Sequence, residues 1–246
     1  MLSLLVGNVT LLIYILTTWF LINAFSSANM GLGLILATVA TGGFMVLLFG
    51  YAHCAAIISD FGSPSIGLFF TSILKKAKEG FLFGLLLGIL IIGCFFGIPM
   101  YFSMHSFIGT MLGLFLFWVE VITLLALQWF IPVMFLMNNS FKKTLKKCFI
   151  LFFDNPGFTL FMALYTIVLL TASTVLVFLM PSFTGITLAQ INALRLRLYK
   201  YDWIEQHPEL TSRKDQKNIP WKALLQQDKE TLGPRNIRSF IFPWKD

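Results

Sequence analysis

The chain has 246 residues, 57% of them hydrophobic and 12% charged, and a formal net charge of +7. Soluble domains carry roughly 25% charged residues, so this composition excludes an ordinary soluble protein and predicts a polytopic membrane protein. The positive net charge does not indicate a nucleic-acid partner. The cations gather between apolar segments and beyond residue 194, and no nucleic-acid-binding motif accompanies them.

The residues before Asp60 include no charged side chain. A helix that crosses the hydrocarbon layer needs about 20 mostly apolar residues. This criterion predicts spans at about 4–25, 31–58, 81–102, 110–137 and 157–180. The run from Leu11 to Ile22 also resembles the apolar part of a cleaved signal peptide. We expect a retained helix instead, because no Lys or Arg precedes the run and a second apolar span follows at once.

Two clusters of lysines between these spans set the expected orientation. They are Lys75, Lys76 and Lys78, and Lys142, Lys143, Lys146 and Lys147. Because basic loops remain in the cytoplasm, both clusters and the N-terminus are predicted to be cytoplasmic. The basic tail then returns to the cytoplasm only through a sixth crossing, from Pro181 to about Leu198. A re-entrant or interfacial helix at that place is the alternative.

The sequence therefore predicts an all-α, polytopic transmembrane helical bundle of about six spans at 1–198, followed by a cytoplasmic tail at 199–246. The two basic connections also resemble each other, since a shift that places Phe70 on Phe141 aligns their lysines and the Phe-rich spans that follow. Each connection is typical of an amphipathic stretch in the headgroup layer, whose cations face anionic lipid or a protein partner.

The tail is predicted to contain a helix at about 220–232, followed by an apolar, aromatic C-terminus. We expect the tail to dock on the cytoplasmic face of the protein, on the membrane or on a partner, because exposing aromatic side chains to water is less favourable than burying them. The docking residues are expected to be Trp221, Phe240, Phe242 and Trp244. The acidic Asp228 and Glu230 are expected to face the lysine clusters.

Glu120 is the acid that lies inside the apolar spans. A carboxylate within the bilayer is costly unless it is paired or protonated. Glu120 is therefore either a proton or substrate site, or a structural acid bonded to Thr123, Gln128 or a neighbouring helix. His53, near the end of the second span, is a candidate partner, and Gln128 marks a polar, kinked section of the fourth. Glu120, His53 and Gln128 make up the candidate intramembrane polar site.

Motifs for catalysis, phosphate binding and metal binding are missing from the sequence, so we expect no enzyme activity, no cofactor and no metal. Cys54, Cys94 and Cys148 form no Cys-x-x-Cys pair. They are expected to be small buried hydrophobes.

The stretch from Asp60 to Phe81, including the basic run Leu74–Gly80, resembles the corresponding segment of the YesL-like family of bacterial integral membrane proteins. The second half of the chain extends this resemblance to about 5–198 through four further motifs. They are Trp129-Phe130-Ile131-Pro132, Phe141–Lys147, Asn155-Pro156 and Pro181-Ser182-Phe183. The chain lacks the usual Pro-containing start of the family's second segment, and its tail is longer.

The resemblance implies an accessory component of the bacterial cytoplasmic membrane that assists carbohydrate uptake through contact with ABC transporter subunits. It implies no catalytic residue. The alternative is a self-sufficient small-solute transporter that uses the buried acid Glu120.

Overall fold

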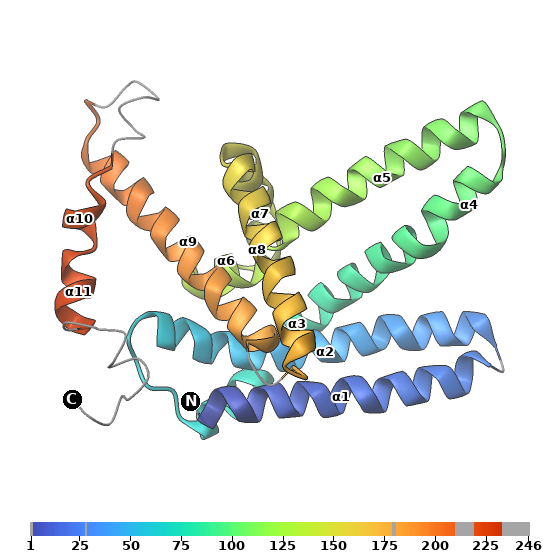
Figure 1. Ribbon diagram of the computed structural model, residues 1–246, viewed down its shortest axis with the longest axis horizontal. Coiled ribbons are helices and arrows are strands. Elements are labelled where there is room, and N and C mark those ends of the chain that lie inside the picture. Colours follow the sequence, from blue (N-terminus) through green and yellow to red (C-terminus); the bar gives the residue numbers. More distant parts are fainter. Residues whose placement is uncertain (1, 28, 179–180, 210–218, 233–246) are drawn as a thin grey trace.

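The computed structural model describes residues 2–27, 29–178, 181–209 and 219–232, and within these ranges it contains helices and turns but no strand (Figure 1). The predicted all-α class is confirmed. The helical elements, in chain order, are α1 (Leu2–Ser26), α2 (Met30–Ser59), α3 (Ile66–Ile92), the π-helical η1 (Gly93–Gly97), α4 (Ile98–Ser103), α5 (Phe107–Leu127), α6 (Phe130–Leu136), α7 (Phe141–Asp154), α8 (Pro156–Val175), α9 (Ser182–Gln206), α10 (Trp221–Leu224) and α11 (Gln226–Leu232).

Five helical segments are long and apolar enough to cross a membrane. They are Val6–Ser26, Met30–Ser59, Gly67–Ser103, Phe107–Leu136 and Pro156–Val175. The prediction of a multi-pass membrane protein is therefore confirmed. The third segment is longer than the predicted span because α3 already begins in the first basic connection, where Lys76 has non-helical backbone angles (φ −117°, ψ 15°) and kinks the helix.

Short polar residues begin the helices, as N-capping requires. The side chain of Asn29 accepts hydrogen bonds from the first-turn backbone of α2, and Ser65 and Ser106 do the same for α3 and α5. The fourth segment is broken at Gln128 between α5 and α6. Pro132 accounts for the break, because it has no N–H to donate to the carbonyl of Gln128.

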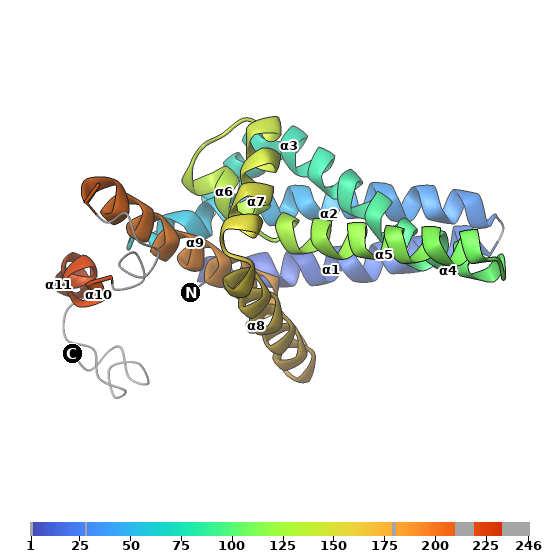
Figure 2. The same ribbon diagram turned by 90° about the horizontal axis from the view of Figure 1, so that it is seen from above.

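The helices α1, α2, α3–α4 and α5 extend in one direction, and α1 and α4 end at that side of the molecule (Figures 1 and 2). The other helices gather at the opposite end. The core lies there too, around Phe49 of α2, whose ring contacts Phe83, Phe130 and Phe135 at centroid distances of 5.4–6.2 Å. The extended half instead leaves large apolar side chains such as Phe20 exposed, as expected for a surface that lipid covers.

The segment predicted as a sixth crossing forms α9, which is not among the five candidate spans. Its first turn lies beside the middle of α2, where the rings of Phe183 and Phe44 are 5.1 Å apart. Thirteen positions into α9, Arg195 reaches Asp60 at the end of α2. The helix α9 therefore runs beside the second half of α2, and both the sixth crossing and its re-entrant alternative stay predictions.

The helices α8 and α9 form an antiparallel hairpin. At its closed end the backbone N–H of Ser182 donates to Ser173 Oγ, and at its open end Tyr201 contacts Asp154 and Asn155. The tail therefore leaves the bundle at the end where α2 ends and α7 meets α8. This agrees with the prediction that the tail and both basic connections share one side.

Two boundaries differ from the sequence prediction. The helix α9 continues to Gln206, so the expected division at 198/199 is not a break in secondary structure. The tail helix expected at about 220–232 consists of two pieces, α10 and α11, separated at Leu225.

Candidate functional site

Glu120 lies on α5 with its side chain 3% exposed, against the π-helical segment η1. Its Oε2 accepts a hydrogen bond of 2.6 Å from Cys94 Sγ. Gly93 lies so close to Glu120 Oε1 that any Cβ at this position would overlap the carboxylate oxygen. The glycine therefore permits the close approach of α5 and η1. The wider π turn of η1 brings the Cys94 thiol to the Glu120 carboxylate, and such turns are often found at functional sites.

The partner of Glu120 is thus on a neighbouring helix, one of the alternatives expected from the sequence. Thr123 and Gln128 are occupied elsewhere, since Thr123 Oγ1 donates to the carbonyl of Val119. Cys94 differs from the expected buried hydrophobe because its thiol is a hydrogen-bond donor, whereas Cys54 and Cys148 are fully buried as expected.

Gln128 joins the break between α5 and α6 to α8. Its Nε2 donates to the carbonyls of Leu125 (3.0 Å) and Thr159 (2.9 Å). The indole Nε1 of the adjacent Trp129 donates to Thr159 Oγ1 at 3.1 Å. These bonds satisfy polar groups inside the bundle, where an unpaired donor is costly, and they fix α8 against the end of α5.

Between α2, α3, α5, α6 and α9 lies a cavity of about 200 Å³. Its polar lining consists of Gln128, Thr187 and Gln190, and the remaining lining is apolar. Among the described residues no charged side chain lines it, and Glu120 is not part of its wall. The buried acid and the central cavity are therefore separate features.

His53 connects three helices. Ser72 Oγ donates its single proton to the carbonyl of Leu68, so the Nδ1–H of His53 donates to Ser72 Oγ at 2.6 Å. The imidazole also stacks on Phe135 of α6, with 6.1 Å between ring centroids. His53 does not contact Glu120. The structure consequently places Glu120, His53 and Gln128 in three separate polar contacts rather than in one site.

Each lysine cluster has at least one member near α6. Lys75 and Lys76 lie close enough to His53 to interact with it electrostatically, and Lys147 Nζ is 3.6 Å from Met137 Sδ at the end of α6. We call the combined surface the basic face, and its residues are Lys75, Lys76, Lys78, Lys142, Lys143, Lys146 and Lys147. All but Lys76 and Lys147 are exposed. Both ion pairs in the described part of the chain involve Arg195, so no ion pair there neutralises these lysines.

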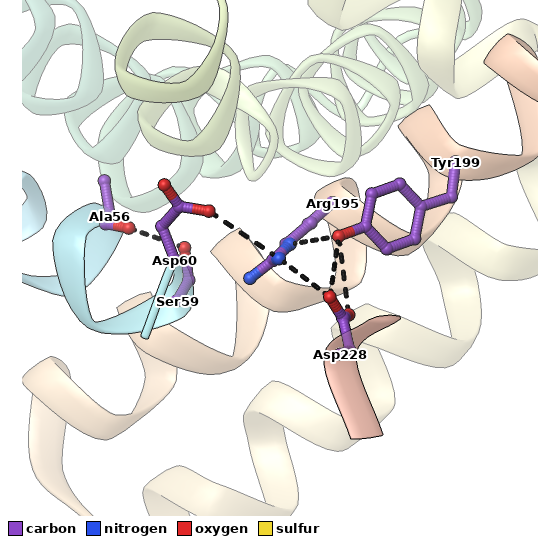
Figure 3. A network of polar contacts seen from close by, with 6 residues as sticks. All are labelled: Ala56, Ser59, Asp60, Arg195, Tyr199 and Asp228. Carbon is purple, nitrogen blue, oxygen red and sulfur yellow. Dashed lines mark hydrogen bonds and ion pairs between the residues drawn. The ribbon is translucent and has the colours of Figure 1, made fainter. Parts of the chain in front are cut away.

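Arg195 on α9 binds the tail to the bundle (Figure 3). Its Nη2 lies 3.2 Å from Asp228 Oδ1 of α11 and 3.6 Å from Asp60 Oδ1 at the end of α2. Its Nε donates to the Tyr199 hydroxyl at 2.8 Å, and that hydroxyl lies 3.2 Å from Asp228 Oδ1. The guanidinium also covers the ring of Phe61 at 4.7 Å. Three segments that are distant in the sequence therefore meet at one cation.

This cluster was not predicted from the sequence. Asp228 was expected to face the lysine clusters, but its partner is Arg195, because α9 lies between α11 and the end of α2 (Figure 3). The available signal was the spacing of Arg195 and Tyr199, which are four residues apart and therefore share one face of a helix. Of the expected docking residues, Trp221 is 37% exposed, and Phe240, Phe242 and Trp244 lie outside the described residues.

A second polar cluster joins α7 to α9. The Tyr201 hydroxyl donates to Asp154 Oδ2, and Asn155 Nδ2 donates to the same oxygen at 2.6 Å and to the Tyr201 hydroxyl at 2.6 Å. Burial, together with the hydrogen bond and the charge of Asp154, raises the pKa of Tyr201 to about 12. The phenol therefore remains protonated and can donate throughout the physiological pH range.

Comparison of the chain with protein-family models, with curated proteins and with solved structures finds no match. The resemblance to the YesL-like family stays a prediction from the sequence. In the ranges that the structure describes, no group of three or more His, Cys, Asp or Glu side chains is arranged to hold a metal ion.

Proposed function

We propose that this chain is a non-catalytic accessory component of the bacterial cytoplasmic membrane, which acts by binding subunits of a carbohydrate ABC-type importer through its basic face. The observation that carries the proposal is that most lysines of the basic face are exposed and that none is in an ion pair of the described part. The identity of the partner rests on the resemblance to the YesL-like family.

The amphipathic character of α7 supports a binding surface rather than a solvated loop. Its Thr144, Cys148 and Phe152 are buried against the bundle, whereas Lys142 and Lys146 are exposed on the other side. A helix fixed in this way presents its cations at set positions, which lowers the entropy lost when a partner binds.

The alternative, a self-sufficient transporter, requires an ionisable group on a route through the bundle. Glu120 is bonded to Cys94 and is not part of the cavity wall, and the cavity is small and apolar in most of its lining. These observations favour the accessory component over the transporter.

The test is recovery of importer subunits with the full-length protein purified from its native membranes in mild detergent. Reversing two cations of α7, as Lys142→Glu with Lys146→Glu, should lower their recovery about tenfold, because two attractive contacts become repulsive. The matched control reverses two exposed cations of the tail, as Lys222→Glu with Lys229→Glu, and should leave recovery unchanged. Equal losses in both variants would contradict the proposed surface.

The competing function is tested with the protein alone in liposomes. Solute flux that is abolished by Glu120→Gln, together with purification free of importer subunits, would establish the transporter instead.

A further inference from the structure

One face of α7 is apolar at its centre and charged at both ends. Lys147, Ile150, Leu151 and Asp154 lie on this face, at positions i, i+3, i+4 and i+7. The two charges are seven residues apart, which corresponds to about 10 Å along a helix. This face lines a space toward α9 and borders the core, because Leu151 packs against the core cluster beside the buried residues Cys148 and Phe152.

The opposing face of α9 is apolar and ends at a phenol. Leu194, Leu198 and Tyr201 lie at positions i, i+4 and i+7, and Met137 at the end of α6 closes the gap between the helices. The helices α7 and α9 are not in extended contact along this stretch. Their side chains are bonded to each other at the Tyr201 end, where the phenol donates to Asp154.

The result is a space of about 440 Å³ between two apolar stripes, within the roughly 300–1,000 Å³ typical of small-molecule sites. Helices with matching apolar stripes normally pack against each other, so a gap of this size between them points to an occupant. The gap belongs to an amphipathic helix of the kind that lies at the level of lipid headgroups. A lipid acyl chain is the apolar group available at that level.

The charged residues at the rim narrow the choice of lipid. Lys147 offers a cation whose contact in the described part is Met137 Sδ, which is only a weak acceptor. Asp154 offers a carboxylate whose Oδ2 accepts from Tyr201 and Asn155, while Oδ1 accepts no bond from a described residue. Arg197 of α9 covers the Phe158 ring, with its guanidinium 3.8 Å from the ring centroid, and lies close enough to Asp154 to interact with it electrostatically, although no ion pair joins the two in the described part of the chain.

We propose that the space between α7 and α9 binds a zwitterionic phospholipid that carries a primary ammonium, such as phosphatidylethanolamine. Its phosphate lies at Lys147, its ammonium lies at Asp154, and one acyl chain descends between Leu151 and Leu198. A cation and a carboxylate on the same rim match the two opposite charges of this headgroup. A phosphatidylcholine headgroup has no N–H to donate to Oδ1 of Asp154, and an anionic headgroup brings no cation to this carboxylate.

The experiment is native mass spectrometry of the full chain in detergent with equal amounts of phosphatidylethanolamine, phosphatidylcholine and phosphatidylglycerol. We expect phosphatidylethanolamine to be retained about tenfold better than phosphatidylcholine, as expected for one charge-assisted hydrogen bond. Asp154→Asn should remove this preference, and Lys147→Ala should lower the retention of both zwitterionic lipids. Lys222→Ala, an exposed lysine on α10 outside the space, should leave both retention and preference unchanged. Circular dichroism and thermal melting of each variant identify any change caused by misfolding.

Three outcomes would overturn the proposal. Equal retention of the ethanolamine and choline lipids would indicate ordinary annular lipid. Preference for phosphatidylglycerol that depends on Lys147 alone would indicate a simple anion site. If a variant ending at Leu232 binds the lipid and the full chain does not, the occupant is the C-terminal segment of the chain itself. Leu198→Trp, which fills the space, should abolish retention of every lipid if the acyl chain lies there.

Discussion

The contact between Arg195 and Asp228 predicts how firmly the tail helix α11 is held. Both side chains are largely buried, at 16% and 21% exposed, so their charge-assisted hydrogen bond should stabilise the docked state by about 1.5–3 kcal/mol. Asp60 approaches the same guanidinium at 3.6 Å but is 85% exposed, and such a pair contributes only about 0–1 kcal/mol. Asp228→Asn should therefore release α11 far more readily than Asp60→Asn.

Hydrogen exchange of the amides at 226–232, measured on the full chain in detergent, reports this release directly. Because about 1.4 kcal/mol corresponds to a factor of ten, Asp228→Asn should raise the exchange rates about tenfold or more. Asp60→Asn should raise them by no more than about threefold. The matched control on α11 is Glu230→Gln, because Glu230 is exposed and its contact is with Gln226 of the same helix. If Glu230→Gln or Asp60→Asn accelerates exchange as much as Asp228→Asn, Arg195 is not what holds the tail.

Three further outcomes are expected. Gly93→Ala should lower the free energy of unfolding in detergent by about 1–3 kcal/mol because its Cβ overlaps the Glu120 carboxylate, whereas Gly97→Ala meets only an ordinary contact and should have little effect. In the same assay, Trp129→Phe should lower the free energy of unfolding by about 1 kcal/mol, because it removes the hydrogen bond to Thr159 and keeps most of the ring packing. An unchanged free energy of unfolding would contradict this hydrogen bond. Reporters fused to the C-terminus and inserted in both basic connections should be active in the same compartment, and a C-terminal reporter active only outside the cytoplasm would disprove the shared side.

The spans and turns could be predicted because they depend on local properties. Apolar length alone identifies the five segments, and Asn29 and Ser106 begin helices through bonds to their own next turn. Pro132 similarly explains the break after α5. These features follow from neighbours in the sequence, so a reading along the chain can find them.

The polar partners could not be predicted, because each depends on which helices are adjacent in space. Gln128 is bonded to Thr159, which lies 31 residues away. The partner of Glu120 is Cys94, which reaches it only because η1 widens the helix by a π turn that the sequence does not announce. The position of α9 beside the second half of α2 could not be predicted either, because hydropathy along the chain does not identify the neighbours of a helix.

Within the bundle, the polar side chains serve to specify helix neighbours. Lipid is as apolar as leucine, so apolar faces give little preference for one helix pair over another, and hydrogen bonds between helices supply it. Such bonds join α1 to α9, α2 to α3, α5 to η1, and α5 to α8, through Asn8–Thr184, His53–Ser72, Glu120–Cys94 and Gln128–Thr159. Because these side chains are committed to one another, the buried acid is not available to an outside partner, whereas most lysines of the basic face are exposed, and the proposed binding surface is therefore that face.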